Sequence, residues 1–307
     1  MEFLSGKRYN AIDGYYKDRF GCKIAKVPLD GGFTCPNRDG TKGYGGCIYC
    51  SERLSGDFTH PEAENLYEQF MLTKAALDNK WKNLKYIPYF QSGSATYAPT
   101  DYLRKLYYEA LSLPNSVGIS IATRPDCICA DVLDLLSELS QKTYISVELG
   151  LQSVFDETGR IINRCTSFEE FVSAFNSLKE RGICTCVHLI NGLPNETREM
   201  MLESVRTVSK MKPHSVKIHL LNIIKNTPAE KIYNEGKIKL FELEEYIKLA
   251  CDELEILDSS IYVARITADC ERSKLIAPEW SFKKRTILNG IDKELSLRNT
   301  YQGIYAN

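Results

Sequence analysis

Three cysteines in one glycine-rich stretch are the residues of this chain best suited to chemistry. They are Cys35, Cys47 and Cys50, so that their spacing is C-x11-C-x2-C. Two thiolates at C-x2-C can bind one metal ion or two corners of an iron–sulfur cluster, and the third can return from the loop. Structural zinc would need a fourth ligand, for which Cys22 or His60 is available. A cubane bound by three cysteines would leave one iron open for a substrate or cofactor. Both interpretations are open at this point, and so is a set of three unrelated buried cysteines.

The composition is that of an ordinary globular protein with free thiols. The chain has 307 residues, with 39 basic and 40 acidic side chains and a formal net charge of −1. This balance excludes a nucleic-acid-binding protein that is basic throughout. No apolar run approaches the roughly 20 residues that span a bilayer, and no apolar signal core follows the first residues. The odd count of 11 cysteines, in a chain too long to need disulfides, favours reduced thiols. We therefore expect a cytoplasmic protein without a membrane partner.

Strand and helix patterns alternate along much of the chain. The expected strands are 22–27, 86–90, 117–122, 144–151, 184–190 and 215–220. The expected helices between them are 61–80, 103–111, 130–139, 167–181 and 197–211. Ser167 and Glu170 form a capping box at the start of the fourth helix. Such an alternation with short connections predicts a parallel sheet with right-handed crossovers.

Six units rather than eight favour a partial, open (β/α)6 barrel of the α/β class over a closed barrel. Loops at the carboxyl ends of the strands build the site in such barrels, and the cysteine loop follows the first strand. The expected organisation is an N-terminal lead-in (1–20), a core barrel (21–220) and a C-terminal α+β extension (221–307). The extension contains an expected helix at 243–257, a strand at 262–267 and a helix around 282–297, and we expect it to pack laterally on the barrel.

The cysteine motif resembles that of the radical S-adenosylmethionine (SAM) superfamily. In that superfamily three cysteines follow the first strand of a (β/α)6 pattern, with an aromatic residue just before the last one, here Tyr49. The resemblance implies one [4Fe–4S] cluster and SAM as cofactors, in a radical SAM barrel. It also implies reductive cleavage of SAM to a 5′-deoxyadenosyl radical, which abstracts a hydrogen atom from the substrate.

The resemblance extends to segments that bind SAM. After the second expected strand the sequence reads FQSGSATY, where the superfamily has a glycine-rich turn for the methionine amino group. This implies contacts from Ser92, Gly93 and Ser94, although only Gly93 matches the usual triple glycine. The fourth expected strand ends in ELGLQS, which resembles the branch that contains oxygen-independent coproporphyrinogen oxidase and the elongator catalytic subunit. That branch implies that Gln152 contacts the ribose and that Arg164 pairs with the methionine carboxylate.

Five further side chains are candidates for contacts with cofactor or substrate. Tyr49 offers its ring to adenine. His188 stands just before NGLP, where the branch often has an acidic ribose ligand, and a satisfied core histidine is the alternative. Glu148, Arg265 and Asp269 are candidates for contact with the substrate. The alternatives are a buried structural carboxylate for Glu148 and an inter-element salt bridge for the other two.

Within this branch the sequence is most similar to the bacterial YhcC/YtqA-type radical SAM family. The shared features are IATRPDC at 121–127, RITAD at 265–269 and TYQG at 300–303. The resemblance implies tRNA as partner and its wobble uridine as the favoured substrate, in a step that converts 5-carboxymethylaminomethyl-uridine into 5-aminomethyl-uridine. It also implies an electron donor such as flavodoxin or ferredoxin.

A local excess of basic residues agrees with a nucleic-acid partner. From Arg206 to Lys239, eight Lys or Arg stand against two Glu. Together with His214, His219 and the sequence KKR at 283–285, this run favours a phosphate-binding surface near the barrel mouth. The alternative is a solvated face.

Three alternatives are open from the sequence. A radical SAM enzyme could act on a small molecule or a protein, and a non-catalytic (β/α) binding protein could be stabilised by zinc. The pairs Cys127/Cys129 and Cys184/Cys186 could bind a second metal site, because residues two apart on a strand share a face. Small core residues are the other interpretation of these two pairs.

Overall fold

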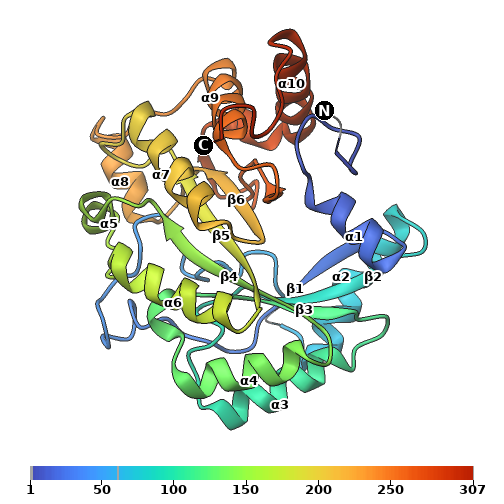
Figure 1. The fold of residues 1–307 in the computed structure, drawn as a ribbon. Helices are drawn as coiled ribbons and strands as arrows, with labels where there is room; N and C mark the ends of the chain where they lie inside the picture. The colour runs from blue at the N-terminus through green and yellow to red at the C-terminus, as the bar shows by residue number, and fades with distance from the viewer. Residues whose placement is uncertain (1–2, 61, 307) are drawn as a thin grey trace.

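Seven parallel strands form one curved sheet in the computed structural model, which describes residues 3–60 and 62–306 (Figure 1). Their spatial order is β1-β2-β3-β4-β5-β6-β8, so that strands successive in the chain are neighbours. The strands are β1 (Ile24–Leu29), β2 (Lys85–Phe90), β3 (Gly118–Thr123), β4 (Tyr144–Gln152), β5 (Cys184–Asn191), β6 (Ser215–Leu220) and β8 (Tyr262–Arg265). The predicted six-unit α/β half-barrel is confirmed, and β8 extends it by a seventh strand.

Helices cover the outer face of the sheet (Figure 1). The longer ones are α2 (Leu66–Lys80), α3 (Thr100–Leu111), α4 (Ala130–Ser140), α6 (Phe168–Glu180), α7 (Arg198–Met211), α9 (Leu243–Ile256) and α10 (Lys284–Leu297). The predicted capping box of Ser167 and Glu170 begins α6. The expected start of the first long helix, residue 61, lies outside the described residues. Of the described helices, none combines the length and the hydropathy that a bilayer crossing needs.

Several short elements are additional to the predicted ones. They are α1 (Ile12–Phe20), α5 (Asp156–Ile161), α8 (Pro228–Asn234), the short helices η1 (Pro125–Cys127) and η2 (Glu279–Phe282), and the strands β7 (Ile223–Ile224) and β9 (Leu275–Ala277). β7 and β9 pair with each other in an antiparallel sheet. All of them are shorter than the roughly 11 residues over which an apolar period becomes recognisable, so the sequence pattern does not reveal them.

Alternation along the strands separates apolar from polar side chains. On β4, Val147 and Leu149 belong to the main apolar core, whereas Glu148 between them lines a cavity inside the curve of the sheet. On β6, Ile218 lies in the same core and Lys217 lines the cavity. Because successive side chains of a strand point to opposite faces, one sheet packs against helices outside and carries polar groups inside.

The N-terminal lead-in and the C-terminal extension meet at the edge of the sheet beside β8. Ala11 forms a parallel bridge with Val263 of β8, and the Val263 N–H donates to the Asn10 carbonyl at 2.7 Å. The C-terminal segment thus contributes a strand to the sheet as well as packing beside it. The domain boundaries after residues 20 and 220 stay predictions, and residues 1, 2 and 307 lie outside the described part of the chain.

Gln302 provides a test of this junction, because its side chain joins three separate backbone segments. It is fully buried, accepts from the Asn10 N–H at 2.7 Å and donates to the carbonyls of Asp258 and Ile261 at 2.9 and 2.8 Å. Gln302→Ala should lower the free energy of unfolding by about 1–3 kcal/mol or more, because buried groups lose their partners. Denaturant unfolding measures this, with the exposed Gln141→Ala as matched control. Equal losses in both variants would contradict the assignment.

Candidate active site

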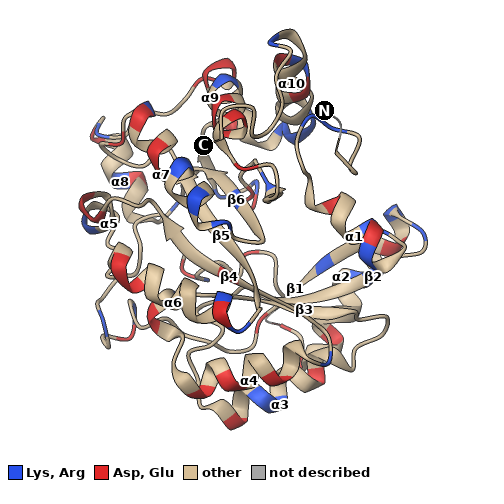
Figure 2. Cartoon of the chain, in the orientation of Figure 1, with Lys and Arg blue, Asp and Glu red and all other residues tan. Residues whose placement is uncertain are grey.

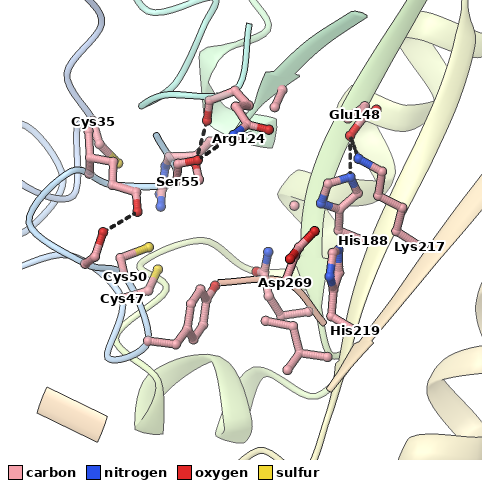
Figure 3. Close-up of a pocket in the computed structure, with 18 of the residues that line it drawn as sticks. Cys35, Cys47, Cys50, Ser55, Arg124, Glu148, His188, Lys217, His219 and Asp269 are labelled. Atoms are coloured by element: carbon pink, nitrogen blue, oxygen red, sulfur yellow. Dashed lines mark hydrogen bonds and ion pairs between the residues drawn. The ribbon is translucent and has the colours of Figure 1, made fainter. Parts of the chain in front are cut away.

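A cavity of about 320 Å³ lies inside the curve of the sheet, at the carboxyl ends of the strands. Cys35, Cys47 and Cys50 line one wall, and Glu148 and His188 lie across the cavity from them (Figure 3). The carboxyl ends of the strands are where barrels of this type place their sites, and the volume is within the range of small-molecule pockets. The fold therefore brings the predicted cysteines together with candidates from β4 and β5.

Hydrogen bonds from elements far along the chain fix the cysteine loop. The Ile48 N–H donates to the Ile162 carbonyl at 3.1 Å, and the Ala229 N–H donates to the Ile48 carbonyl at 3.0 Å. The side-chain amide of Asn163 donates to the Gly46 carbonyl at 2.8 Å. The end of α5 and the start of α8 thus hold a loop that forms no regular secondary structure of its own.

The electrostatic environment of the loop favours a thiolate. A hydrogen bond from the Cys50 thiol and the positive charge of Arg124 lower the pKa of Cys47 to about 6. The Asn37 amide nitrogen lies 3.7 Å from Cys47 Sγ as a further donor. The hydrogen bond with Cys47 and burial raise the pKa of Cys50 well above its usual value. Cys47 is therefore the member of the C-x2-C pair that is held as thiolate, the metal-binding form of cysteine.

The three loop thiols are not all as close together as the ligands of one zinc ion. Thiolates around a single zinc, at about 2.3 Å from the metal, would lie within about 4 Å of one another. Within residues 3–60 and 62–306, one set of three possible metal ligands has all its donor atoms within 4.8 Å of one another. This set is Glu148, Cys186 and His188, and it does not include the loop cysteines. Cys22 packs in an apolar cluster at the amino ends of the strands, and His60 pairs with a neighbouring glutamate. Neither lines the cavity, so the structure does not support them as a fourth ligand.

The turn after β2 packs directly against the start of the cysteine loop. Gly93 has φ +67°, and a Cβ there would lie 2.5 Å from the Phe33 carbonyl oxygen, so a side chain is excluded. The Ser94 N–H donates to the Thr34 carbonyl at 2.9 Å. Gly93 and Ser94 line the cavity, whereas Ser92 is buried outside its lining.

Arg164 lines the cavity, but most of its donors are already used within the protein. Nη1 donates to the carbonyls of Leu151 and Ser153 at 2.6 and 2.7 Å, Nε donates to that of Thr166 at 2.9 Å, and Nη2 pairs with Asp156 at 3.0 Å. A guanidinium has five N–H groups, so one on Nη2 is left without a partner among the described residues. Arg164 therefore holds the end of β4 in place, a role that its sequence position does not reveal.

Gln152, Tyr49 and His188 line the same cavity. Gln152 has φ +65° at the point where the pairing of β4 with β5 shifts register. Its side-chain amide lies over Gly150, because a Cβ added to Gly150 would be 2.7 Å from Gln152 Nε2. Burial raises the pKa of the Tyr49 phenol, so this ring is neutral. Burial and the neighbouring positive charge also lower the pKa of His188 to about 4, so its imidazole is neutral at pH 7.

Glu148 is the centre of a buried polar network, which we call the polar floor of the cavity. Its carboxylate takes donors from five other strands. They are Lys26 Nζ at 2.5 Å, the Ser120 hydroxyl at 3.1 Å, the Tyr89 hydroxyl at 2.7 Å, His188 Nε2 at 2.7 Å and Lys217 Nζ. Burial alone would raise the pKa of Glu148, but the charges of Lys217 and Lys26 and the His188 bond hold it well below its usual value. The geometry thus favours the structural alternative for this ionised carboxylate.

The remaining cysteine candidates do not gather into a second site. Cys127 is buried, Cys129 is exposed, and Cys184 packs in the apolar cluster at the amino ends of the strands. Cys186 lies beside Glu148. Glu148, Cys186 and His188 are close enough to hold a metal ion, but two lysines already neutralise the carboxylate there, so a further cation would be repelled.

The cavity also contains side chains that sequence reasoning did not assign to the site. Lys217 and His219 come from β6, and Arg124 follows β3. Lys26 of β1 does not line the cavity but reaches Glu148 in its polar floor. Arg124 makes two hydrogen bonds to Asp126 and donates to the Arg164 carbonyl. A lysine between apolar residues in the middle of a sheet strand is the signal that could have found Lys26 and Lys217, because unpaired lysines are rarely buried.

The predicted basic surface is wrong for three of its members. Lys217 is buried in the polar floor, and His219 lines the cavity. His214 packs against Tyr15 and Tyr262 at the amino ends of the strands. On the outer helices, Lys and Arg are interspersed with Asp and Glu (Figure 2). The prediction is wrong at these three positions because the run passes through a strand and its preceding turn, where side chains close in sequence point to different faces.

Arg265 and Asp269 both line the cavity. Asp269 forms an ion pair with Lys284, the first residue of α10, so the salt-bridge alternative describes this residue. Arg265 ends β8 and lies opposite Lys217 of β6 in the parallel register.

Comparisons with known proteins agree with this geometry. Residues 35–208 match the Radical SAM superfamily and residues 213–296 the Radical_SAM C-terminal domain. The chain is 46% identical to the uncharacterized protein YtqA of Bacillus subtilis over 297 residues, which are 97% of this chain and 92% of that protein. The chain is also 27% identical to a tRNA uridine(34) acetyltransferase of Methanocaldococcus infernus over 163 residues, which are 52% of this chain and 30% of that protein.

A solved structure shows the same fold. The archaeal Elp3 of Methanocaldococcus infernus with an N-terminal deletion has a TM-score of 0.65 at 18% identity, covering 91% of this chain and 64% of that chain. The superfamily match spans more than half of the chain and includes the loop with the three cysteines. This chain therefore belongs to the radical SAM superfamily, whose enzymes bind a [4Fe–4S] cluster and SAM.

Proposed function

We propose that this radical SAM enzyme acts on the wobble uridine of tRNA, in the step that converts 5-carboxymethylaminomethyl-uridine into 5-aminomethyl-uridine. The observation that carries the proposal is the match of about half the chain to a relative named as a tRNA uridine(34) acetyltransferase. The resemblance to the YhcC/YtqA-type family supports the same substrate.

Cys35, Cys47 and Cys50 would hold the cluster, because their thiols line one wall of the cavity. When bound, the cluster and SAM together would supply reductive cleavage of SAM and hydrogen-atom abstraction from the substrate. Gly93 and Ser94 would border the methionine end of SAM, and Gln152 its ribose. A donor protein such as flavodoxin or ferredoxin would deliver the electron.

The rim of the cavity offers contacts for a tRNA backbone. Lys225 follows Ile224, which lines the cavity, and is exposed. Lys283 and Arg285 are exposed on either side of Lys284, whose ion pair with Asp269 fixes the start of α10 at the cavity. A flipped base could enter between these groups at an unstacking cost of a few kcal/mol. The cations would bind the flanking phosphates, which add affinity without sequence specificity.

The cluster assignment is tested by removing one thiol at a time. Replacing Cys35, Cys47 or Cys50 by Ala should abolish the brown colour or leave a labile cluster, and SAM cleavage should stop. Cys184→Ala and Cys129→Ala are the matched controls and should keep about four irons per chain, as expected for one cubane. Iron analysis and absorbance after anaerobic reconstitution measure this. Full iron content and cleavage in all three loop variants would refute the assignment.

The SAM contacts predict two different outcomes. Gln152→Ala should weaken SAM binding by about 0.5–1.5 kcal/mol, the range for a neutral hydrogen bond, and leave the melting temperature unchanged. Arg164→Ala should weaken it by about 1.5–3 kcal/mol and also lower the melting temperature, because the Leu151 and Ser153 carbonyls lose their donor. Anaerobic calorimetry and thermal unfolding separate the two effects, with the exposed Arg160→Ala as control. Unchanged SAM affinity in Arg164→Ala would show that its remaining N–H binds no carboxylate.

The tRNA partner is tested at the rim. Changing Lys225, Lys283 and Arg285 together to Glu should weaken tRNA binding and reduce its salt dependence by up to about one logarithmic unit per lost contact. The control variant changes Lys80, Lys82 and Lys105 to Glu. These exposed lysines lie on α2, on the loop after it and on α3, and none of them lines the cavity. Binding is measured at about 50 and 200 mM salt, a range over which phosphate contacts change affinity strongly. If the two triple variants bind tRNA equally well, a small-molecule or protein substrate becomes the better interpretation.

A further inference from the structure

The guanidinium of Arg265 is a cation at the cavity wall without a partner among the described residues. Arg265 is half-buried at the end of β8 and lines the cavity. The other two arginines of the lining, Arg124 and Arg164, each pair with an aspartate. Within residues 3–60 and 62–306, no ion pair and no hydrogen bond joins the Arg265 side chain to the protein. Because this guanidinium opens to the cavity and has no acidic partner among the described residues, it is available to an anion from outside the chain.

The charges of the polar floor and of Arg265 do not balance. Lys26, Lys217 and Arg265 supply three positive charges, and Glu148 supplies one negative charge. Burial lowers the pKa of Lys217 to about 8, so its ammonium is still protonated at pH 7. The neighbouring Asp269 is neutralised by its own lysine partner. The polar floor and Arg265 together therefore carry two uncompensated positive charges.

The two histidines of this wall do not add to the charge. Burial lowers the pKa of His188 to about 4 and that of His219 well below its usual value, so both are neutral at pH 7. Their ring centroids lie 5.2 Å apart. His219 lines the cavity on the same strand as Lys217 and can donate a hydrogen bond from a neutral ring without further charge.

The position of this cationic wall separates it from the cluster. Figure 3 shows Glu148, His188, Lys217 and His219 on one side of the cavity and the three cysteines on the other. Arg265 pairs in register with Lys217 and so belongs to the side away from the cysteines. In the proposed function the carboxylate of SAM is held at the cysteine side. An anion at Arg265 would then belong to the second reactant.

We propose that Arg265, next to Lys217 and His219, binds a carboxylate of the substrate, so that the group that enters this cavity is a carboxylic acid. A planar guanidinium binds a carboxylate through two parallel hydrogen bonds. Backbone phosphates of a nucleic acid stay outside when one base is flipped into a pocket, which favours a carboxylate over a phosphate here. The proposal deepens the proposed function and rests on it for the identity of the substrate.

The subsite itself is tested with acetate as the probe. Cluster-loaded, SAM-saturated protein should broaden the carboxyl resonance of ¹³C-labelled acetate, and Arg265→Ala should weaken this binding by about tenfold or more, as for loss of a charged hydrogen bond. Arg265→Lys should retain part of it. Arg272→Ala, at an exposed arginine of the following segment, should bind acetate like the wild type. Iron content and melting temperature confirm that each variant is folded and loaded.

Three results of this titration would overturn the proposal. Equal acetate binding by the wild type and Arg265→Ala would show that the guanidinium binds no carboxylate. Arg265-dependent binding that disappears when SAM is added would assign the residue to the carboxylate of SAM itself. Tighter Arg265-dependent binding of inorganic phosphate than of acetate would indicate a phosphate-bearing substrate.

A second comparison identifies the source of the carboxylate. Two tRNAs that differ in carrying 5-carboxymethylaminomethyl-uridine or 5-aminomethyl-uridine differ by the one carboxymethyl group. The wild type should bind the carboxymethyl form about tenfold more tightly or better, and Arg265→Ala should bind both forms equally. If acetate binding depends on Arg265 but neither tRNA binds, the proposed function fails and the carboxylate subsite stands. If the wild type binds both tRNAs equally, the subsite does not read this carboxylate and the substrate assignment made here is wrong.

Discussion

The ionised carboxylate of Glu148 is the interaction on which the inner face of the half-barrel depends. This carboxylate accepts hydrogen bonds from side chains of β1, β2, β3, β5 and β6. The Glu148 side chain is fully buried. Without it, Lys217 would be left as a buried charge without an acidic partner, a loss that typically costs about 3–5 kcal/mol. The half-buried Lys26 would also lose its ion pair. One acidic residue at the middle of the sheet thus allows the inside of the barrel to be polar while its outside packs against helices.

The polar floor also determines what kind of cavity the barrel can offer. Its donors are turned towards Glu148, so the floor is fixed by internal hydrogen bonds. The cysteine loop on the opposite wall is fixed differently, because Ile48 donates a backbone hydrogen bond to Ile162 and accepts one from Ala229. Both walls meet at the carboxyl ends of the strands because parallel strands end at the same edge of a sheet. The cavity is therefore pre-formed between two separately supported walls.

The C-terminal segment completes this cavity rather than forming a separate unit beside it. It adds β8 to the sheet, and it brings Arg265 and Asp269 to the cavity wall. The ion pair of Asp269 with Lys284 joins the wall to α10, and Val263 joins β8 to the N-terminal lead-in. The two ends of the chain are thus part of the structure that surrounds the site.

The sequence by itself determined the order and type of the main elements, the cysteine motif and the superfamily. The strand expected at 144–151 is Tyr144–Gln152, and the helix expected from Ser167 begins with its capping box. These features depend on neighbours within a few residues, through periodicity, capping and spacing. Only the tertiary structure decided that Lys217 lies in the polar floor and not on a basic surface, and that Arg164 binds backbone carbonyls of β4. It also decided that Arg265 faces the cavity without an ion pair or hydrogen bond among the described residues. The physical reason is that the pattern of a strand shows which of its residues share a face but not what that face contacts. The partner of a buried charge can come from a strand more than 60 residues away, as Glu148 does for Lys217.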